Sequence, residues 1–192
     1  MVLRACCYAL LMLSTLSSAG AASGAALEDF FGVYVGRAQV RDGDGTLLGE
    51  RDLDITIEAG RMGGFKVSWI SVELVDGRRD VPGVERHILE SAFQAPKDGT
   101  YAEDTRRTLF ATRGHSDLLK GDTLRWARIE GEVLSVFSLA VLPEGGYEVQ
   151  AYERRLTEAG LDISFRRIVD DQVVLTVEGK AVRVAEEIKD SE

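Results

Sequence analysis

Residues 52–58 read Asp52-Leu53-Asp54-Ile55-Thr56-Ile57-Glu58, with polar and apolar side chains alternating at every position. Successive side chains of a β-strand point to opposite faces, so this stretch predicts a strand with one apolar and one polar face. The pattern returns at 161–165 and, with less contrast, at 147–151. Two further runs, 65–75 and 133–142, are apolar on both faces, which predicts strands covered on both sides.

Glycine-containing turns separate these runs at short intervals, for example at Asp76-Gly77, Asp98-Gly99 and Gly145-Gly146. Glycine accepts the positive φ that tight hairpin turns require, so such steps between apolar runs predict hairpins. We therefore predict about eight to ten strands, with candidate positions at 32–40, 47–58, 65–75, 84–93, 104–112, 122–130, 132–142, 146–156, 160–169 and 172–184.

The pattern after residue 26 contains no long amphipathic helix and no alternation of strands with helices. Consecutive strands joined by short turns favour an antiparallel meander, and closure into a barrel removes its unpaired sheet edges. We predict an all-β, antiparallel up-and-down barrel formed by a single domain at 27–185, with a β-sandwich as the alternative. The charged residues 186–192 are expected to form a disordered tail.

The N-terminal segment has the layout of an export signal. Arg4 precedes an apolar stretch at about 8–16, and small residues that include Ala19-Gly20-Ala21 follow it. We predict a signal peptide over residues 1–24, cleaved between about residues 21 and 26. The protein would then be exported, to the periplasm of a bacterium or, as the alternative, to the extracellular space. No transmembrane segment is expected after the signal, because no later apolar run approaches roughly 20 residues.

Composition narrows the classes of function. Cys6 and Cys7 are the only cysteines and precede the predicted cleavage site, so the mature chain has neither a disulfide nor a thiolate nucleophile or metal ligand. Arg4 is the only charged residue before Leu27, which leaves 22 basic and 32 acidic residues and a net charge of −10. This acidity disfavours nucleic acid and anionic lipid head groups as partners.

Motifs for catalysis or metal binding are weak. Glu85 and His87 would share one face of a strand, but no third ligand follows at a matched spacing. The run His115-Ser116-Asp117 contains the residue types of a hydrolase triad, yet adjacent side chains diverge, and a polar turn explains it better. We assign no catalytic residue, no metal and no cofactor, and an enzyme is the least favoured interpretation.

The segment Phe31-Gly32-Val33-Tyr34-Val35-Gly36 resembles the opening strand of lipocalin-like (calycin) barrels, in which Gly-x-Trp or Gly-x-Tyr begins the first strand. The later meander at 126–167 is compatible with that architecture. The resemblance implies that a small apolar ligand binds inside the barrel.

Arginines carry the strongest signal for a binding site. Every second residue of a strand lies on the same face. In three predicted strands, the series of residues on the apolar face reaches an arginine: Leu161, Ile163 and Phe165 lead to Arg167, Leu124 and Trp126 to Arg128, and Val149 and Ala151 to Arg155. Inward arginines near a barrel mouth would bind a carboxylate or phosphate group by bidentate hydrogen bonds. The alternative is that they lie at strand ends and pair with Glu130 and Glu153.

These observations predict an exported, soluble β-barrel that binds a small, largely apolar or amphipathic ligand without covalent chemistry. Its ligand site would comprise Arg128, Arg155 and Arg167, with Trp69, Trp126 and Tyr152 as the wall. The alternative is an envelope protein–protein interaction or assembly module with a barrel filled by side chains. An open, apolar-lined cavity would favour the first function, and a contiguous exposed apolar patch would favour the second.

Overall fold

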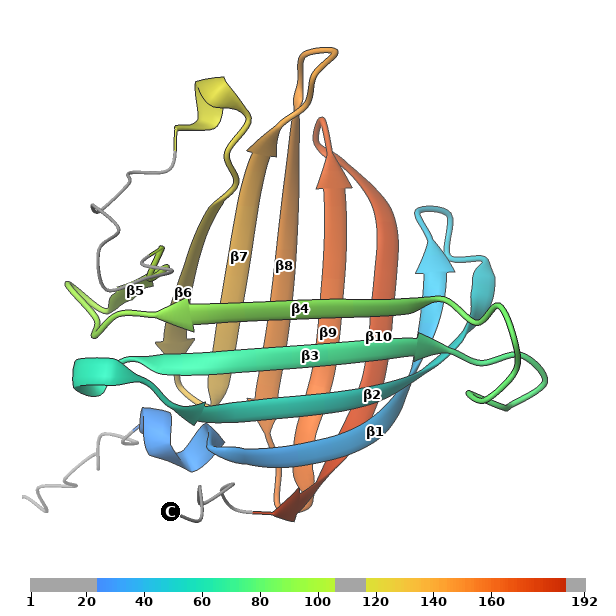
Figure 1. Ribbon diagram of the computed structural model, residues 1–192, viewed down its shortest axis with the longest axis horizontal. Helices are drawn as coiled ribbons and strands as arrows, with labels where there is room; N and C mark the ends of the chain where they lie inside the picture. The colour runs from blue at the N-terminus through green and yellow to red at the C-terminus, as the bar shows by residue number, and fades with distance from the viewer. Residues whose placement is uncertain (1–23, 106–116, 186–192) are drawn as a thin grey trace, which may run out of the picture.

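The computed structural model describes residues 24–105 and 117–185 (Figure 1). This part of the chain forms ten strands and three short 3-10 helices. The strands are β1 (Gly32–Asp42), β2 (Leu47–Ala59), β3 (Phe65–Glu73), β4 (Arg86–Phe93), β5 (Thr100–Ala102), β6 (Leu124–Glu130), β7 (Val133–Val141), β8 (Tyr147–Leu156), β9 (Gly160–Val169) and β10 (Gln172–Ala185). The helices are η1 (Leu27–Phe30), η2 (Arg61–Gly63) and η3 (Leu118–Lys120).

All ten strands belong to one antiparallel sheet in the order β4-β3-β2-β1-β10-β9-β8-β7-β6-β5. Each strand pairs with the next strand of the chain, except that β4 and β5 are the two edges of the sheet. β1 also pairs with β10, which joins the first and last strands. Figure 1 shows β1–β4 crossing in front of β6–β10 at a steep angle. The fold is the predicted all-β, up-and-down barrel, nearly closed, and the β-sandwich alternative is wrong.

The two edge strands of the sheet are β4 and β5, and the seam between them is bridged at one end of the barrel. Phe93 and Glu103 form a bridge, and backbone hydrogen bonds run from Gln94 N to Ala102 O (2.9 Å) and from Asp104 N to Ala92 O (2.7 Å). Among the described residues, no backbone bond of this kind joins the seam near Arg86, where β4 begins. The barrel therefore has one tied end and one looser end.

Nine predicted strands match the observed ones within a few residues. The fifth, at 104–112, lies mostly outside the described residues, and β5 occurs earlier in the chain, at Thr100–Ala102. The chain turns at Asp98 and Gly99, whose φ angles are 50° and 75°, and β5 starts directly afterwards. Only residues 104 and 105 of the predicted strand at 104–112 are described, and neither is in a strand. The Asp-Gly turn brings the chain onto β6 earlier than the apolar pattern indicated, because pairing begins as soon as the turn is complete.

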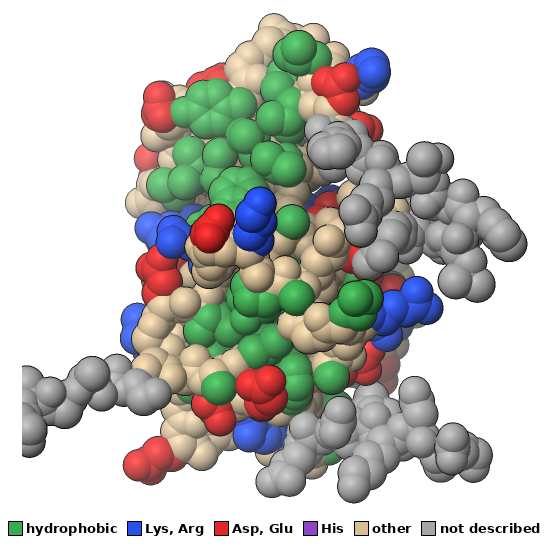
Figure 2. Space-filling view, turned by 90° about the vertical axis from the view of Figure 1, so that its left-hand side faces the viewer, with side chains coloured by type: hydrophobic (Ala, Val, Ile, Leu, Met, Phe, Trp, Pro, Cys, Tyr) green, Lys and Arg blue, Asp and Glu red, His purple; other side chains and the backbone are tan. Residues whose placement is uncertain are grey.

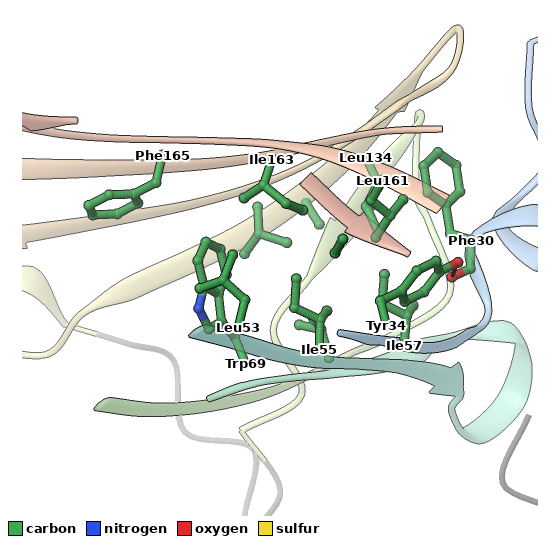
Figure 3. Close-up of a cluster of buried hydrophobic side chains, with 14 of the residues drawn as sticks. Phe30, Tyr34, Leu53, Ile55, Ile57, Trp69, Leu134, Leu161, Ile163 and Phe165 are labelled. Atoms are coloured by element: carbon green, nitrogen blue, oxygen red, sulfur yellow. Dashed lines mark hydrogen bonds between the residues drawn. The ribbon is translucent and has the colours of Figure 1, made fainter. Parts of the chain in front are cut away.

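Inward apolar side chains fill the tied half of the barrel. Figure 3 shows Leu161, Ile163 and Phe165 of β9 facing Leu53, Ile55 and Ile57 of β2 across the interior. At the tied end of the barrel, η1 places Phe30 over the opening, where its side chain is fully buried. The Tyr34 hydroxyl donates to Phe30 O (2.7 Å) and accepts from Arg183 Nη2 (2.8 Å), which ties η1 to β1 and β10.

Two glycines allow β1 and β10 to approach closely. A Cβ at Gly36 would lie 2.0 Å from Lys180 O, and one at Gly179 would lie 2.3 Å from Arg37 O. Strand glycines of this kind mark tight bends where two backbones meet. They permit the sheet to coil here, so that its two halves face each other.

Several predictions concern residues outside the described ranges. These are the signal peptide, apart from residue 24, with Cys6 and Cys7; His115 and Ser116; and the tail at 186–192. Within residues 24–105 and 117–185, no helix has the length and apolar character needed to cross a membrane.

Candidate functional site

A cavity of about 470 Å³ lies in the looser half of the barrel, between β2, β3 and β4 on one side and β8, β9 and β10 on the other. This volume falls within the roughly 300–1,000 Å³ typical of small-molecule sites. Its apolar lining comes from both sides of the barrel, namely Trp69, Leu89, Phe165, Leu175 and Val177. Figure 3 shows Trp69 and Phe165 projecting toward each other from opposite sides of the barrel.

Three aromatic rings form the floor of the cavity. Tyr152 lies between the other two, with its ring centroid 5.1 Å from that of Trp69 and 4.5 Å from that of Phe165. Edge and tilted ring contacts of this kind add to the stability supplied by burial. The floor divides the hollow half of the interior from the filled half.

One wall of the interior is polar, because the inward residues of β8 are polar. Tyr152 donates to Gln150 Oε1 (2.6 Å), and Gln150 Nε2 in turn donates to Glu148 Oε1 (2.5 Å). Glu148 also accepts two hydrogen bonds from Arg167, from Nε at 2.9 Å and from Nη2 at 2.6 Å. A continuous hydrogen-bonded chain therefore leads from the floor to the mouth.

Burial and neighbouring groups shift the pKa values of Glu148 and Tyr152 in this hydrogen-bonded chain. Burial acts to raise the pKa of Glu148, but hydrogen bonds from Arg167 and Gln150 outweigh it and hold that pKa below its ordinary value. Burial raises the pKa of the Tyr152 phenol, although the positive charges of Arg154 and Arg125 oppose the rise. At neutral pH Glu148 is thus a carboxylate and Tyr152 a neutral hydroxyl.

The mouth is rich in cations. Arg167 of β9 and Arg51 of β2 line it, as does His87 of β4, which lies 3.5 Å from Glu85. His87 and Glu85 are both more than half exposed. Among the described residues, no three His, Cys, Asp or Glu side chains gather in a way that could hold a metal ion.

Arg154 lies beneath the floor and is fully buried, with 0% of its surface exposed. Its guanidinium carbon stands 5.0 Å from the centroid of the Trp69 ring, in a cation–π contact. No group in residues 24–105 or 117–185 accepts a hydrogen bond from its Nε or Nη1 atom. Burial lowers the pKa of Arg154 to about 10, so it remains a cation at neutral pH.

Three of the six predicted site residues line the cavity: Trp69, Tyr152 and Arg167. The other three lie on the outer face of the barrel. Trp126 stacks on Phe137 at 5.3 Å there, while its neighbour Ala127 is the buried inward residue. Arg128 pairs with Glu130 at 3.2 Å, with half of its side chain exposed.

Arg155 is also exposed, because the inward position belongs to Arg154. The prediction for Arg155 started from Val149 and Ala151, which lie on the outer face of the barrel, opposite Leu139 and Phe137. The prediction that Arg128 and Arg155 point inward is therefore wrong. Sequence reasoning did not place Arg154 or Arg51 in the site. The signal for Arg154 was that it is adjacent to Arg155, so that one of the two must face the interior.

Fold and cavity together define a class of protein: an antiparallel β-barrel with one filled half and one hollow half. A search of protein-family models and a search of curated proteins found no match to this chain.

Proposed function

We propose that this protein is a lipocalin-like binding protein that holds a small, largely apolar ligand in the barrel and performs no covalent chemistry on it. The observation that carries the proposal is the cavity of about 470 Å³, with aromatic and aliphatic walls and a cationic mouth. Concave, mostly apolar sites with a few placed polar groups are where proteins bind small molecules. The resemblance of the segment at 31–36 to lipocalin-like first strands supports the same conclusion.

A cavity-filling variant tests this function. Leu175 lines the cavity, so Leu175→Trp should occupy its volume and abolish binding. Thr176→Trp is the matched control, because the adjacent residue points to the outer face and faces Arg166 of β9. The purified protein is extracted with organic solvent for mass spectrometry, and its melting temperature is measured against a panel of fatty acids and isoprenoids. Empty protein with an unchanged melting temperature across the panel would contradict the proposal.

We further propose that the protein works in a bacterial periplasm, on the strength of the export signal at residues 1–24. Cell fractionation and N-terminal sequencing of the mature protein test this step. A mature N-terminus between residues 21 and 26 in the periplasmic fraction is the expected result. A full-length chain in the cytoplasm would contradict it and would leave the ligand-binding proposal untouched.

A second function, as a protein–protein interaction module, is favoured by an apolar patch on the outer face of β6–β8. Three of the residue pairs across these strands are apolar: Leu124 with Leu139, Trp126 with Phe137, and Leu139 with Val149. Leu124 is 40% exposed, and Figure 2 shows hydrophobic side chains gathered on the side that carries β6 and η3. Contiguous patches of this kind mark interaction sites.

This second function is tested by crosslinking in cells. A partner that crosslinks to the wild type and is lost in Trp126→Ser, but retained in Arg155→Ser, would support it. If the same species are captured by all three proteins, the patch has no such role.

A further inference from the structure

The buried guanidinium of Arg154 has no anion among its neighbours in the described part of the chain. It pairs across the sheet with Leu134 of β7 and Ile163 of β9, which are both buried and apolar. Trp69 covers it from the opposite side of the barrel. An aromatic ring attracts the positive charge but accepts none of the in-plane N–H bonds, and Nε and Nη1 are left unpaired.

The other two inward arginines of this wall each have a carboxylate. Arg125 Nη1 lies 3.2 Å from Glu103 Oε1, and Arg167 Nη2 lies 2.6 Å from Glu148 Oε2. Arg154 is the third, and no acidic group within residues 24–105 and 117–185 forms an ion pair with it. The wall therefore carries one cation in excess, inside a protein whose overall charge is negative.

An uncompensated buried charge is strongly destabilising, and proteins pair such charges or use them for function. Arg154 is adjacent to the cavity, because Trp69 and Tyr152 line the cavity and Trp69 also contacts the guanidinium. Only the floor of aromatic rings separates the unpaired donors from the hollow half. Trp69 meets Tyr152 edge to face, and Tyr152 meets Phe165 at a tilted angle. Access from the cavity to Arg154 therefore requires a rotation of Trp69.

We propose that Arg154 is the internal counter-ion for an acidic group of the ligand. The ligand class is an amphipathic monoanion, which enters acid first and leaves its apolar part against Phe165, Leu175 and Val177. This inference rests on the proposed ligand-binding function and adds the charge and orientation of the ligand. Arg51 and Arg167 at the mouth attract the anion, and Arg154 binds it after the floor opens.

A matched pair of probes tests the charge requirement. Dodecanoate and dodecan-1-ol share their chain and differ in the acidic group. Trp69 and Trp126 are the only tryptophans, so a Trp126→Phe background makes the fluorescence of Trp69 a direct reporter of the floor. We expect dodecanoate to bind roughly 10–100-fold more tightly than the alcohol, as a charge-assisted hydrogen bond implies, and to change the Trp69 emission.

Variants in that background assign the preference to one residue. Arg154→Gln should bring the two dissociation constants to about the same value, whereas Arg155→Gln, the neighbour on the outer face, should keep the preference. Arg154→Met should raise the melting temperature of the ligand-free protein, because it removes a buried charge while keeping most of the volume. A purely structural role of Arg154, in its contact with Trp69, would instead lower that temperature and leave the preference for the acid unchanged.

The possible failures are distinguishable. If the wild type binds both probes equally, the cavity is a ligand site and Arg154 is not its anion subsite. If Arg154→Gln keeps the preference and Arg167→Gln loses it, the acid stays at the mouth and the inference is overturned. If neither probe binds and dodecanoate leaves the melting temperature unchanged, the proposed function fails together with the inference.

Discussion

The two halves of the barrel are built from the same strands but differ in what those strands turn inward. β9 presents Leu161 and Ile163 in the tied half, Phe165 at the floor and Arg167 at the mouth. β2 follows the same gradient, from Ile57 to Arg51. The filled half supplies apolar burial, which is the main source of folding free energy. The hollow half contributes less burial and is left with surface that a ligand can cover.

This division explains how a barrel without disulfides keeps a cavity. The β4–β5 seam is tied beside Phe93, and η1 closes the same end with Phe30. Stabilising contacts are concentrated there, so the other end tolerates polar inward residues and an open volume. Regions that bind ligands are commonly the less stable parts of a fold. The comparison is therefore testable by substituting equivalent residues in each half.

The largest expected effect is the loss of an aromatic ring from the filled half. Phe65 is fully buried, stacks on Phe93 with ring centroids 4.8 Å apart, and meets Tyr101 edge to face with centroids 5.3 Å apart. Phe65→Ala should lower the free energy of unfolding by about 3–5 kcal/mol, because it leaves a cavity in a packed core. Urea denaturation measures the change.

Leu89→Ala is the counterpart in the hollow half, where the side chain is half-buried and lines the cavity. We expect a loss of about 1 kcal/mol, since little burial is removed and the space is already open. Equal losses for the two variants would show that the halves do not differ in stability.

A smaller effect is expected at the closure formed by η1. Tyr34→Phe removes the hydroxyl that donates to Phe30 O and accepts from Arg183. Leaving Phe30 O and the Arg183 guanidinium without this partner should lower the free energy of unfolding by about 1–3 kcal/mol. Tyr147→Phe is the control, because its hydroxyl bonds Asp171 at the exposed hairpin end, and the midpoint of urea denaturation should not move. A Tyr34→Phe protein as stable as the wild type would show that η1 packs without this anchor.

Much of the fold follows from sequence pattern, and the site follows only in part. Alternation and Asp-Gly turns located nine strands, because each strand buries one face and each hairpin requires positive φ. The prediction of which β9 residues face the interior was also correct, since Leu161, Ile163 and Phe165 point inward and lead to Arg167.

The same counting failed on β6 and β8, where the outer face is the more apolar one. Trp126 and Val149 belong to the outer patch, while the inward residues include Arg125, Glu148 and Gln150. A polar ligand wall inverts the usual pattern, so periodicity shows that two faces exist but not which one is inside. Pairing with β7 determines which face of β8 points into the barrel, and this cannot be predicted from the sequence of β8 alone.

The smallest effect concerns the mouth and tests whether its ion pair contributes to stability. The folded pKa of Glu148 is lowered, so its contribution is complete above the unfolded value of about 4.3 and is lost as the pH falls through the folded pKa. Glu148→Gln removes this term, and its denaturation midpoint should fall less steeply than that of the wild type below about pH 4.3. Urea titrations between neutral and acidic pH measure the two slopes. Parallel slopes would mean that this ion pair does not contribute to the stability of the hollow half, which would then depend on the floor and the tied end.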